Sequence, residues 1–544
     1  MIGHHHRREP EPAAATAGGE SAATAGDSAA DKLPPGAGIA MVAIGLGVIV
    51  IANDFTALNV AIPTIEEDFD VDLGTAQWVV NAYALIFGMA IVTGGRLADM
   101  FGRRKIFFIG AGIFAGFSLL GGLAPDAPSL IAMRLFMGVG GALMWPALLG
   151  LTYALLPDSK AGLAGGLILG AAGIGNALGP LIGGFLTEDV TWRAIFFLNV
   201  PIAAFAAAVI YSKVPKDAPG AQEGIDYSGI ATLSVGLILL LLGFDQATDW
   251  GFGDPRVIAF FVVAVLMIVS FAVIEPRQGE RALVPRDVIK NANFRAACLT
   301  VLLISAVFFT VLLYVPQFMI KILDFSPLEA GAGLAPMLVI FAITAFVAGR
   351  FYERVGAKTM VTMGTAGLAI GTILLSLIGD DWTYPDLIPG LAILGFGVGV
   401  FYSAVTTAGV TSLDPSRTSL AGGIIYMFQV AGGAVGLGIT TMIFTLTSES
   451  ELKDKAADAA TPLTEHQSSV LHGLLAGTET SAEAKAELAP AALSRVDEWV
   501  HDSFVIGIQS GFRYAAILAV AGCFVSLFFV GGRLGRSKKP EPAA

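Results

Sequence analysis

The chain has 544 residues, of which 55% are hydrophobic and 14% are charged. This apolar share is above that of ordinary soluble domains and favours a protein that crosses a membrane several times. The net charge of −12 says little about partners, because the position of basic residues matters more than their sum in such a protein. The sequence has no phosphate-binding loop pattern, and its six histidines lie outside the apolar segments, which argues against an ATP-driven pump and a metal centre.

In chain order, a polar tail over residues 1–37 is expected to be disordered. Fourteen apolar segments follow, each long enough for a membrane-spanning helix of about 20 residues. They cover approximately residues 38–62, 77–98, 105–124, 129–155, 161–187, 194–213, 227–244, 256–275, 296–319, 331–351, 358–378, 386–411, 419–446 and 507–532. The sequence therefore predicts an all-α membrane protein, in which the long polar segment 447–506 joins the last two spans.

The basic residues divide unevenly between the two sides of this predicted bundle. If the N-terminus lies in the cytoplasm, the loops and C-terminal tail on that side hold 20 Lys and Arg residues, against 3 in the short loops on the other side. Positively charged loops stay inside during membrane insertion. A multi-pass protein of the cell membrane is therefore predicted, with both termini cytoplasmic, including the tail 533–544, and with residues 447–506 outside.

A charged pattern occurs once in each half of the chain. Residues 95–105, between the second and third segments, and residues 349–358, between the tenth and eleventh, both read Gly-Arg-x-x-acid-x-x-Gly-x-base. If the two segments within 214–295 are an insertion, the copies occupy the same joint of two six-helix halves, 38–213 and 296–532. Such internal symmetry is typical of transporters and places a substrate site between the halves.

Three further motifs accompany this repeat. The first span contains residues 54–63 (Asp-Phe-Thr-Ala-Leu-Asn-Val-Ala-Ile-Pro), the fifth contains Gly-Pro-x-x-Gly-Gly at 179–184, and the sixth begins with 192–201 (Trp-Arg-Ala-Ile-Phe-Phe-Leu-Asn-Val-Pro). Together with 95–105 they resemble the major facilitator superfamily, in its fourteen-spanner drug:proton antiporter branch, over about residues 38–532. The resemblance implies the major facilitator fold, with two pseudo-symmetric six-helix halves and two inserted central helices.

The resemblance assigns a conformational latch to the first charged turn. Asp99 is expected to cap the N-terminus of the thirteenth span near Ser419, where the helix dipole favours a carboxylate. The alternative is a plain positive-inside topology signal. The second copy lacks the doubled arginine, so a weaker latch is expected there. The residues assigned to the latch are Gly95, Asp99, Gly102, Arg103 and Arg104.

The fifth span carries what the resemblance identifies as the antiporter motif. Its glycines permit close helix packing, and its proline removes a backbone donor and softens the helix. The functional interpretation is a pliable seam between the halves that limits leak. The alternative is ordinary small-residue packing. The motif residues are Gly173, Gly175, Gly179, Pro180, Gly183 and Gly184.

Two charged residues within apolar spans are the candidates for proton coupling. Asp54 lies within the first span, where desolvation opposes its charged form, so it is expected to bind and release a proton. Arg134 lies in the fourth span and is expected to tune a nearby carboxylate. The family often has Gln three residues after this Arg, and Met137 replaces it here, which puts a hydrogen-bond relay in doubt. For both charged residues the alternative is a structural role.

Aromatic and amide side chains on several spans are candidates to line a substrate cavity. For each aromatic taken alone, packing against helices or lipid is the commoner role. The candidates are Asn81, Tyr83, Phe87, Trp145, Phe309, Gln317, Tyr402, Tyr426 and Gln429.

The leading hypothesis is a proton-coupled antiporter that exports amphipathic drugs or dyes by alternating access. Its expected partners are a small amphipathic substrate, protons and membrane lipid. It is expected to be a monomer and a secondary transporter rather than an enzyme, with no cofactor, metal or nucleic-acid partner. Two alternatives remain: export of an endogenous lipid or metabolite, and a membrane sensor that transports nothing.

Overall fold

Long α-helices make up the computed structural model of the chain, which describes residues 36–216, 224–458 and 490–531. Among these residues, 14 helices are long and apolar enough to cross a membrane, and no β-strand occurs. The predicted all-α fold with fourteen spans is therefore confirmed. Most of the predicted N-terminal tail, the C-terminal tail and the middle of the polar segment 447–506 lie outside the described residues.

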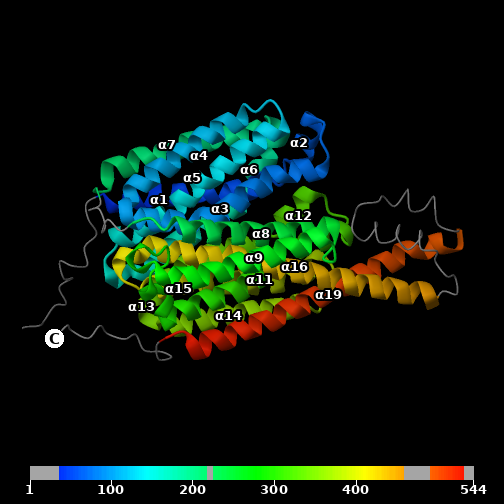
Figure 1. Ribbon diagram of the computed structural model, residues 1–544. Helices are drawn as coiled ribbons and strands as arrows, with labels where there is room; N and C mark the ends of the chain where they lie inside the picture. The colour runs from blue at the N-terminus through cyan, green and yellow to red at the C-terminus, as the bar shows by residue number, and fades with distance from the viewer. Residues whose placement is uncertain (1–35, 217–223, 459–489, 532–544) are drawn as a thin grey trace, which may run out of the picture. The chain divides into compact units, whose positions relative to one another are not determined.

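The first six spanning helices form the first half of the bundle (Figure 1). They are α1 (Ala37–Ala57), α3 (Leu73–Phe101), α4 (Arg103–Gly122), α5 (Ala127–Leu155), α6 (Ala161–Asp189) and α7 (Arg193–Lys213), and the short α2 (Ile62–Phe69) follows α1. The first span was expected to reach residue 62, but α1 ends at Ala57. Pro63, which has no N–H to donate, lies in the first turn of α2 and starts a new helix there.

Local signals explain where α3 begins and ends. Asp72 caps its N-terminus by accepting a hydrogen bond from the Thr75 N–H at 2.9 Å. The hydrogen bonds from Thr75 hold the pKa of the Asp72 carboxyl below its usual value. At the other end, Gly102 has a φ of 100°, a conformation that favours glycine, and it separates α3 from α4.

The second half repeats this arrangement. Its spanning helices are α11 (Ala292–Lys321), α13 (Ala335–Val355), α14 (Ala357–Leu375), α15 (Tyr384–Val410), α16 (Thr418–Asp458) and α19 (Pro490–Phe529), with the short α12 (Pro327–Gly333) before α13. Gly356, with a φ of 91°, separates α13 from α14 as Gly102 separates α3 from α4. We call the end of the bundle that carries Gly102 and Gly356 the turn end.

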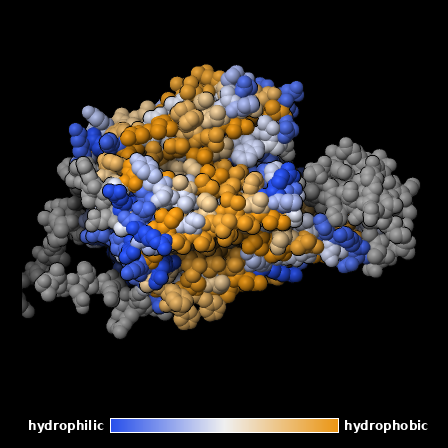
Figure 2. All heavy atoms as spheres, viewed as in Figure 1, coloured by the Kyte–Doolittle hydropathy of each residue, from blue (hydrophilic) through white to orange (hydrophobic). Residues whose placement is uncertain are grey.

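Two helices lie between these halves in the sequence, α8 (Tyr227–Trp250) and α9 (Pro255–Ile274). They pack against each other, and α8 also contacts α3 and α16, so the inserted pair touches both halves (Figure 1). Only 11% of the apolar stretch of α9 is buried inside the protein. In Figure 2 hydrophobic side chains cover the flank of the bundle, and hydrophilic ones gather at its ends, as expected for a membrane protein.

The last two spanning helices are longer than the hydropathy predicts. The polar segment was expected to begin at residue 447, but α16 continues to Asp458 and α19 already begins at Pro490. Lys455 Nζ lies 2.5 Å from Asp502 Oδ2, and Leu452 and Trp499 are buried. Contacts between the two helices therefore extend them beyond their apolar stretches, which hydropathy alone does not reveal.

Candidate functional site

Asp54 and Arg134 form an ion pair inside the first half. Arg134 Nη1 contacts Asp54 Oδ2, and both side chains have 0% exposed area. Arg134 Nε also donates to the carbonyl oxygen of Val79 at 2.7 Å. Because α1 ends at Ala57, Asp54 lies in its last turn, and its burial comes from the packing of α1 against α5 and α7. A charge pair this well buried is costly to break from either side.

A second partner holds the other oxygen of the Asp54 carboxylate. Asn199 Nδ2 of α7 donates to Asp54 Oδ1 at 3.0 Å and contacts Ser118 Oγ at 3.2 Å. Ser118 in turn donates to the Phe196 carbonyl at 2.8 Å. Sequence reasoning gave neither Asn199 nor Ser118 a role. The available signal was an amide inside an apolar span, which needs a polar partner.

Polar groups beside the ion pair are incompletely satisfied. The Tyr83 hydroxyl and Arg134 Nη2 are buried and have no hydrogen-bond partner among the described residues. The Arg134 guanidinium lies 4.4 Å from the centre of the Tyr83 ring. Met137 Sδ, which stands where the family often has a glutamine, lies 4.0 Å from Arg134 Nη1 and is only a weak acceptor. The unpaired N–H of Arg134 Nη2 can donate to a further acceptor, and the Tyr83 hydroxyl can donate or accept.

Four of the predicted cavity residues come together in one aromatic cluster, to which Phe55 of α1 adds a fifth ring. Phe55 lies 4.8 Å from Tyr83 and 5.2 Å from Phe87 between ring centroids. Tyr426 of α16 lies 5.3 Å from Phe87 and 4.7 Å from Trp145. The cluster therefore begins beside the ion pair, at Tyr83, and reaches the second half of the bundle at Tyr426.

Asn81 lies at the contact with the inserted pair of helices. Its Nδ2 donates to Asp245 Oδ1 of α8 at 2.9 Å, and Gln246 Nε2 contacts the other oxygen of Asp245 at 3.1 Å. Sequence reasoning missed Asp245 because the seventh span was expected to end one residue earlier, at 244. Its helix continues to Trp250, so this carboxylate lies within α8.

The remaining predicted cavity residues lie in the second half. The hydroxyl of Tyr402 and Ser305 Oγ are 2.8 Å apart in the buried contact between α15 and α11. Phe309 of α11 packs against Gly433 of α16. Both predicted glutamines of this half are half-buried. They are Gln317 and Gln429.

The first charged turn contacts the N-terminus of α16. Asp99 accepts from the N–H groups of Ser419 at 3.1 Å and Leu420 at 2.8 Å, one on each carboxylate oxygen. Arg103 Nε lies 3.2 Å from the same carboxylate, and its Nη2 donates to the Pro415 carbonyl at 2.6 Å. The turn thus joins α3 to the start of α16 through charge, hydrogen bonds and the helix dipole.

Two further latch candidates serve close packing and helix capping. A Cβ at Gly95 would lie 2.6 Å from the Ser419 carbonyl oxygen, so only glycine permits this approach of α3 to α16. Arg104 donates to the carbonyls of Val214 at 2.7 Å and Tyr211 at 2.8 Å, which places its charge at the C-terminus of α7. Through these hydrogen bonds Arg104 joins α4 to α7 within the first half.

The second charged turn makes a corresponding contact with α6. Glu353 Oε1 accepts from the Gly162 N–H at 3.1 Å, in the first turn of α6. A Cβ at Gly349 would lie 2.5 Å from the Gly162 carbonyl oxygen. Each turn therefore contacts the N-terminus of one helix of the opposite half: the first turn contacts α16, and the second contacts α6.

The glycines of the antiporter motif permit close packing on two faces of α6. Added Cβ atoms at Gly175 and Gly183 would lie 2.7 Å and 2.2 Å from carbonyl oxygens of α1. At Gly173 an added Cβ would lie 3.2 Å from a backbone atom of α13, and at Gly184 3.1 Å from the Leu328 side chain of α12. The motif therefore packs α6 between its own half and the other half.

A hydroxyl from α1 compensates for the motif proline. Pro180 has no N–H for the carbonyl of Asn176, one turn earlier in α6. Thr56 Oγ1 donates to this carbonyl at 3.3 Å, and a Cβ at Gly179 would lie 1.8 Å from the same oxygen. The glycine next to the proline is thus what lets the compensating hydroxyl approach.

Comparison with known proteins decides the family. Residues 44–437, more than half of the chain, match the family described as the Major Facilitator Superfamily. The chain belongs to the Major Facilitator Superfamily. The resemblance seen in the motifs is therefore confirmed.

Relatives in the superfamily are named for resistance and export. The chain is 29% identical over 509 residues to a tetracenomycin C resistance and export protein of Streptomyces glaucescens, covering 92% of both chains. It is 31% identical to the puromycin resistance protein pur8 of Streptomyces alboniger, covering 76% of this chain and 82% of that one. The multidrug transporter protein MdtP of Bacillus subtilis is 26% identical over 90% of this chain and 92% of its own.

Solved structures of the superfamily share the fold. The human organic anion transporter MFSD10 aligns with a TM-score of 0.60 at 14% identity, over 91% of this chain and 100% of that one. A bacterial homologue of the human lysosomal transporter Spinster, in an inward-facing occupied conformation, aligns with a TM-score of 0.54 at 15% identity, over 92% of this chain and 98% of its own. The chain is therefore a multi-pass membrane transporter of the Major Facilitator Superfamily and not an enzyme.

Proposed function

We propose that this transporter is a proton-coupled antiporter that exports small amphipathic compounds, such as drugs or dyes, across the cytoplasmic membrane by alternating access. The names of the relatives, which refer to tetracenomycin C, puromycin and multidrug transport, support an export function. The single observation that carries the proton coupling is the buried pair of Asp54 and Arg134.

Protonation of Asp54 would change which arrangement of the surrounding helices is most stable. The neutral carboxyl no longer compensates the charge of Arg134, and removing one partner of a buried ion pair costs about 3–5 kcal/mol. The pair joins α1 to α5, and Asn199 adds α7. A proton on Asp54 therefore favours a different arrangement of these three helices, in which Arg134 finds water or another partner. This is how the charge state of one carboxyl is proposed to drive a conformational change.

The aromatic cluster is the proposed place for the substrate. Its rings come from both halves, through Tyr83, Phe87 and Trp145 on one side and Tyr426 on the other. Flat aromatic or cationic amphipathic molecules bind well to such faces by stacking and cation–π contact. Because the cluster adjoins the ion pair, substrate and proton would compete for neighbouring sites, as antiport requires.

The two charged turns are the proposed latches of the transport cycle. The uneven distribution of basic residues supports a cytoplasmic position for the turn end and for both termini. Asp99 and Glu353 then hold the cytoplasmic ends of the two halves together, and the inward-facing state requires both contacts to open. The α6 glycines provide a seam on which the halves can slide. The chain is proposed to work as a monomer surrounded by membrane lipid.

Flux and binding measured on the same protein test this proposal. The purified transporter in liposomes, with an imposed pH gradient, should accumulate ethidium against its gradient. Asp54→Asn should abolish the accumulation while ethidium still quenches tryptophan fluorescence. Asp54→Glu, which keeps an ionisable group, should retain part of the flux. Asp254→Asn is the matched control, since it removes a carboxylate from an exposed pair with Arg256.

Other outcomes would favour the alternatives. Wild-type flux in Asp54→Asn would make Asp54 structural and place the proton site elsewhere. Wild-type protein that binds ethidium but moves it under no gradient would point to a sensor. Flux of lipid or of a metabolite extract, without flux of dyes, would point to an endogenous substrate.

A further inference from the structure

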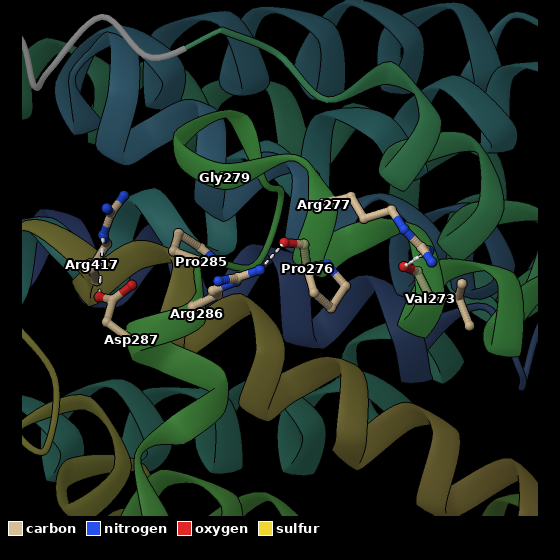
Figure 3. A pocket seen from close by; sticks show the side chains of 8 residues that line it. All are labelled: Val273, Pro276, Arg277, Gly279, Pro285, Arg286, Asp287 and Arg417. Carbon is tan, nitrogen blue, oxygen red and sulfur yellow. Dashed lines mark hydrogen bonds and ion pairs between the residues drawn. The ribbon is translucent and has the colours of Figure 1, made fainter.

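A basic groove lies at the turn end, between the inserted helices and the start of α16. It has a volume of about 810 Å³ and is lined by residues of four short elements, by Pro285 and by the end of α9 (Figure 3). The short elements are η3 (Glu275–Arg277), η4 (Gly279–Arg281), α10 (Arg286–Lys290) and η5 (Pro415–Arg417). The groove therefore joins the inserted pair to the segment that leads into the latch contact of Asp99.

The lining of this groove carries more positive than negative charge. Arg277, Arg286 and Arg417 line it, together with a single acid, Asp287. Arg277 and Arg286 donate to the backbone carbonyls of Val273 and Pro276, each at 2.5 Å, and neither forms an ion pair with a carboxylate among the described residues. Arg417 lies 3.9 Å from Asp287, whose side chain is 58% exposed. The backbone contacts orient the guanidinium groups without neutralising them.

The loop that presents these arginines is built into the protein rather than loosely attached. Glu275, at the start of the loop, is buried and accepts from the Val284 N–H at 2.5 Å. This hydrogen bond closes the loop between η3 and α10. In Figure 3 the side chain of Arg286 points toward Pro276, and that of Arg277 points toward Val273.

One wall of the groove continues onto the surface of the exposed helix α9. Val273, which lines the groove, is 51% exposed. The apolar residues that precede it along α9 are also exposed: Ile258, Val262, Val265, Leu266 and Val269. In a membrane this face contacts acyl chains, so a lipid lying along α9 would have its headgroup at the groove.

We propose that the groove binds the headgroup of an anionic phospholipid, with its acyl chains along α9. Guanidinium groups recognise phosphate oxygens through paired, charge-assisted hydrogen bonds. Basic pockets beside membrane-spanning helices at the membrane surface favour anionic headgroups. The continuous apolar wall favours a lipid over a free anion, because a soluble phosphate would gain nothing from Val273 or α9.

The bound lipid would act on the latch through Arg417. This arginine ends η5, in which the Pro415 carbonyl accepts from Arg103. One residue separates Arg417 from Ser419 and Leu420, whose N–H groups Asp99 caps. A phosphate shared by Arg417 and the arginines of the inserted pair would hold η5 in place. Anionic lipid would therefore stabilise the arrangement in which Asp99 caps α16.

Lipid binding to the full-length purified chain tests the proposal. Native mass spectrometry from detergent would compare phosphatidylglycerol with phosphatidylcholine of the same acyl chains. The double variant Arg277→Gln/Arg286→Gln should lose about 30-fold in affinity for phosphatidylglycerol, since each basic residue near an anionic headgroup contributes about fivefold. Affinity for phosphatidylcholine should stay unchanged. The matched control, Lys213→Gln/Lys216→Gln, removes two exposed charges at the same end, outside the groove.

A conservative variant and a competition experiment complete the test. Arg277→Lys/Arg286→Lys should bind phosphatidylglycerol with intermediate affinity, because charge is kept but the paired donors are lost. Inorganic phosphate at the same concentration should not compete. The proposal is overturned if the glutamine variant binds phosphatidylglycerol like wild type, if the control loses as much affinity as the groove variant, or if inorganic phosphate displaces the lipid.

Discussion

The two charged turns share one backbone design but differ in the side chains that use it. In both, a helix ends at a glycine with positive φ, Gly102 in the first half and Gly356 in the second. In both, a glycine about two turns earlier leaves room for a carbonyl oxygen of the opposite half that an added Cβ would meet. The difference lies in the acid and in the residue after the turn glycine.

Asp99 makes the stronger of the two contacts. It accepts two backbone N–H groups and pairs with Arg103, whereas Glu353 accepts one N–H group, from Gly162. The residue that corresponds to Arg103 in the second half is Ala357, which cannot pair with the acid one turn before it. The repeated glycines thus preserve the interface, while the charges determine how strongly each turn is held.

Asp99→Asn should open the turn end most. The amide keeps the shape of the side chain but loses the negative charge, to which the N–H groups of Ser419 and Leu420 and the Arg103 guanidinium all bind. Hydrogen bonds to charged groups contribute about 1.5–3 kcal/mol, so the ratio of open to closed states should rise about 10- to 150-fold. Spin labels at Lys216→Cys and Arg354→Cys, with both native cysteines replaced, report the distance between the halves. The control is Asp158→Asn, which changes the exposed acid of η2 (Asp158–Lys160). An equal distance shift in this control would show that the effect is not specific to Asp99.

Gly95→Ala and Gly349→Ala should weaken the two contacts equally. The added Cβ would lie 2.6 Å and 2.5 Å from a backbone oxygen of the opposite half, which has to move away. Overpacking of this kind costs about 1–3 kcal/mol. Thermal unfolding and the same spin-label distance would measure it. Gly112→Ala, with nothing within 4 Å of its added Cβ, should be harmless or stabilising. Clearly unequal costs at Gly95 and Gly349 would contradict the shared backbone design.

Glu353→Gln should have a smaller effect than Asp99→Asn. It weakens a single hydrogen bond, worth about 0.5–1.5 kcal/mol, to the first turn of α6. The open state should therefore gain about 2- to 10-fold in the spin-label measurement. Glu188→Gln, an exposed acid near the end of α6, makes the same substitution as a control. An effect as large as that of Asp99→Asn would show that the arginine adds nothing.

Ala357→Arg should strengthen the second turn slightly. An arginine there occupies the position of Arg103 and can reach Glu353 one turn earlier. A partly exposed pair of this kind contributes about 0.3–1 kcal/mol, so the open state should fall at most about fivefold. Ala357→Gln, of similar length but uncharged, is the control. If both variants shift the distances alike, the charge comparison between the turns does not hold.

Much of the fold could be predicted from the sequence. The number of spans and the family follow from long apolar stretches and from motifs in a set order, and both are confirmed. Asp54 and Arg134 could be singled out because charges are rare in such stretches. The partner role of Asn199 toward Asp54 could not be assigned, nor could that of Asp245 on α8 toward Asn81. An amide or acid in a helix reveals that it needs a partner, but not which helix supplies it.

Properties that are local along the chain can be predicted without the fold: which segments are apolar enough to span, where glycine must turn the backbone, and where charges repeat. Properties that depend on how helices rotate and shift against one another require the packed structure. These are the pairing of Asp54 with Arg134, the capping of α16 by Asp99, the hydroxyl that replaces the missing donor at Pro180, and the helices that continue beyond residue 447. The mean hydropathy of a span does not say which neighbouring helix each side chain faces, and a rotation by one residue, about 100°, changes every partner.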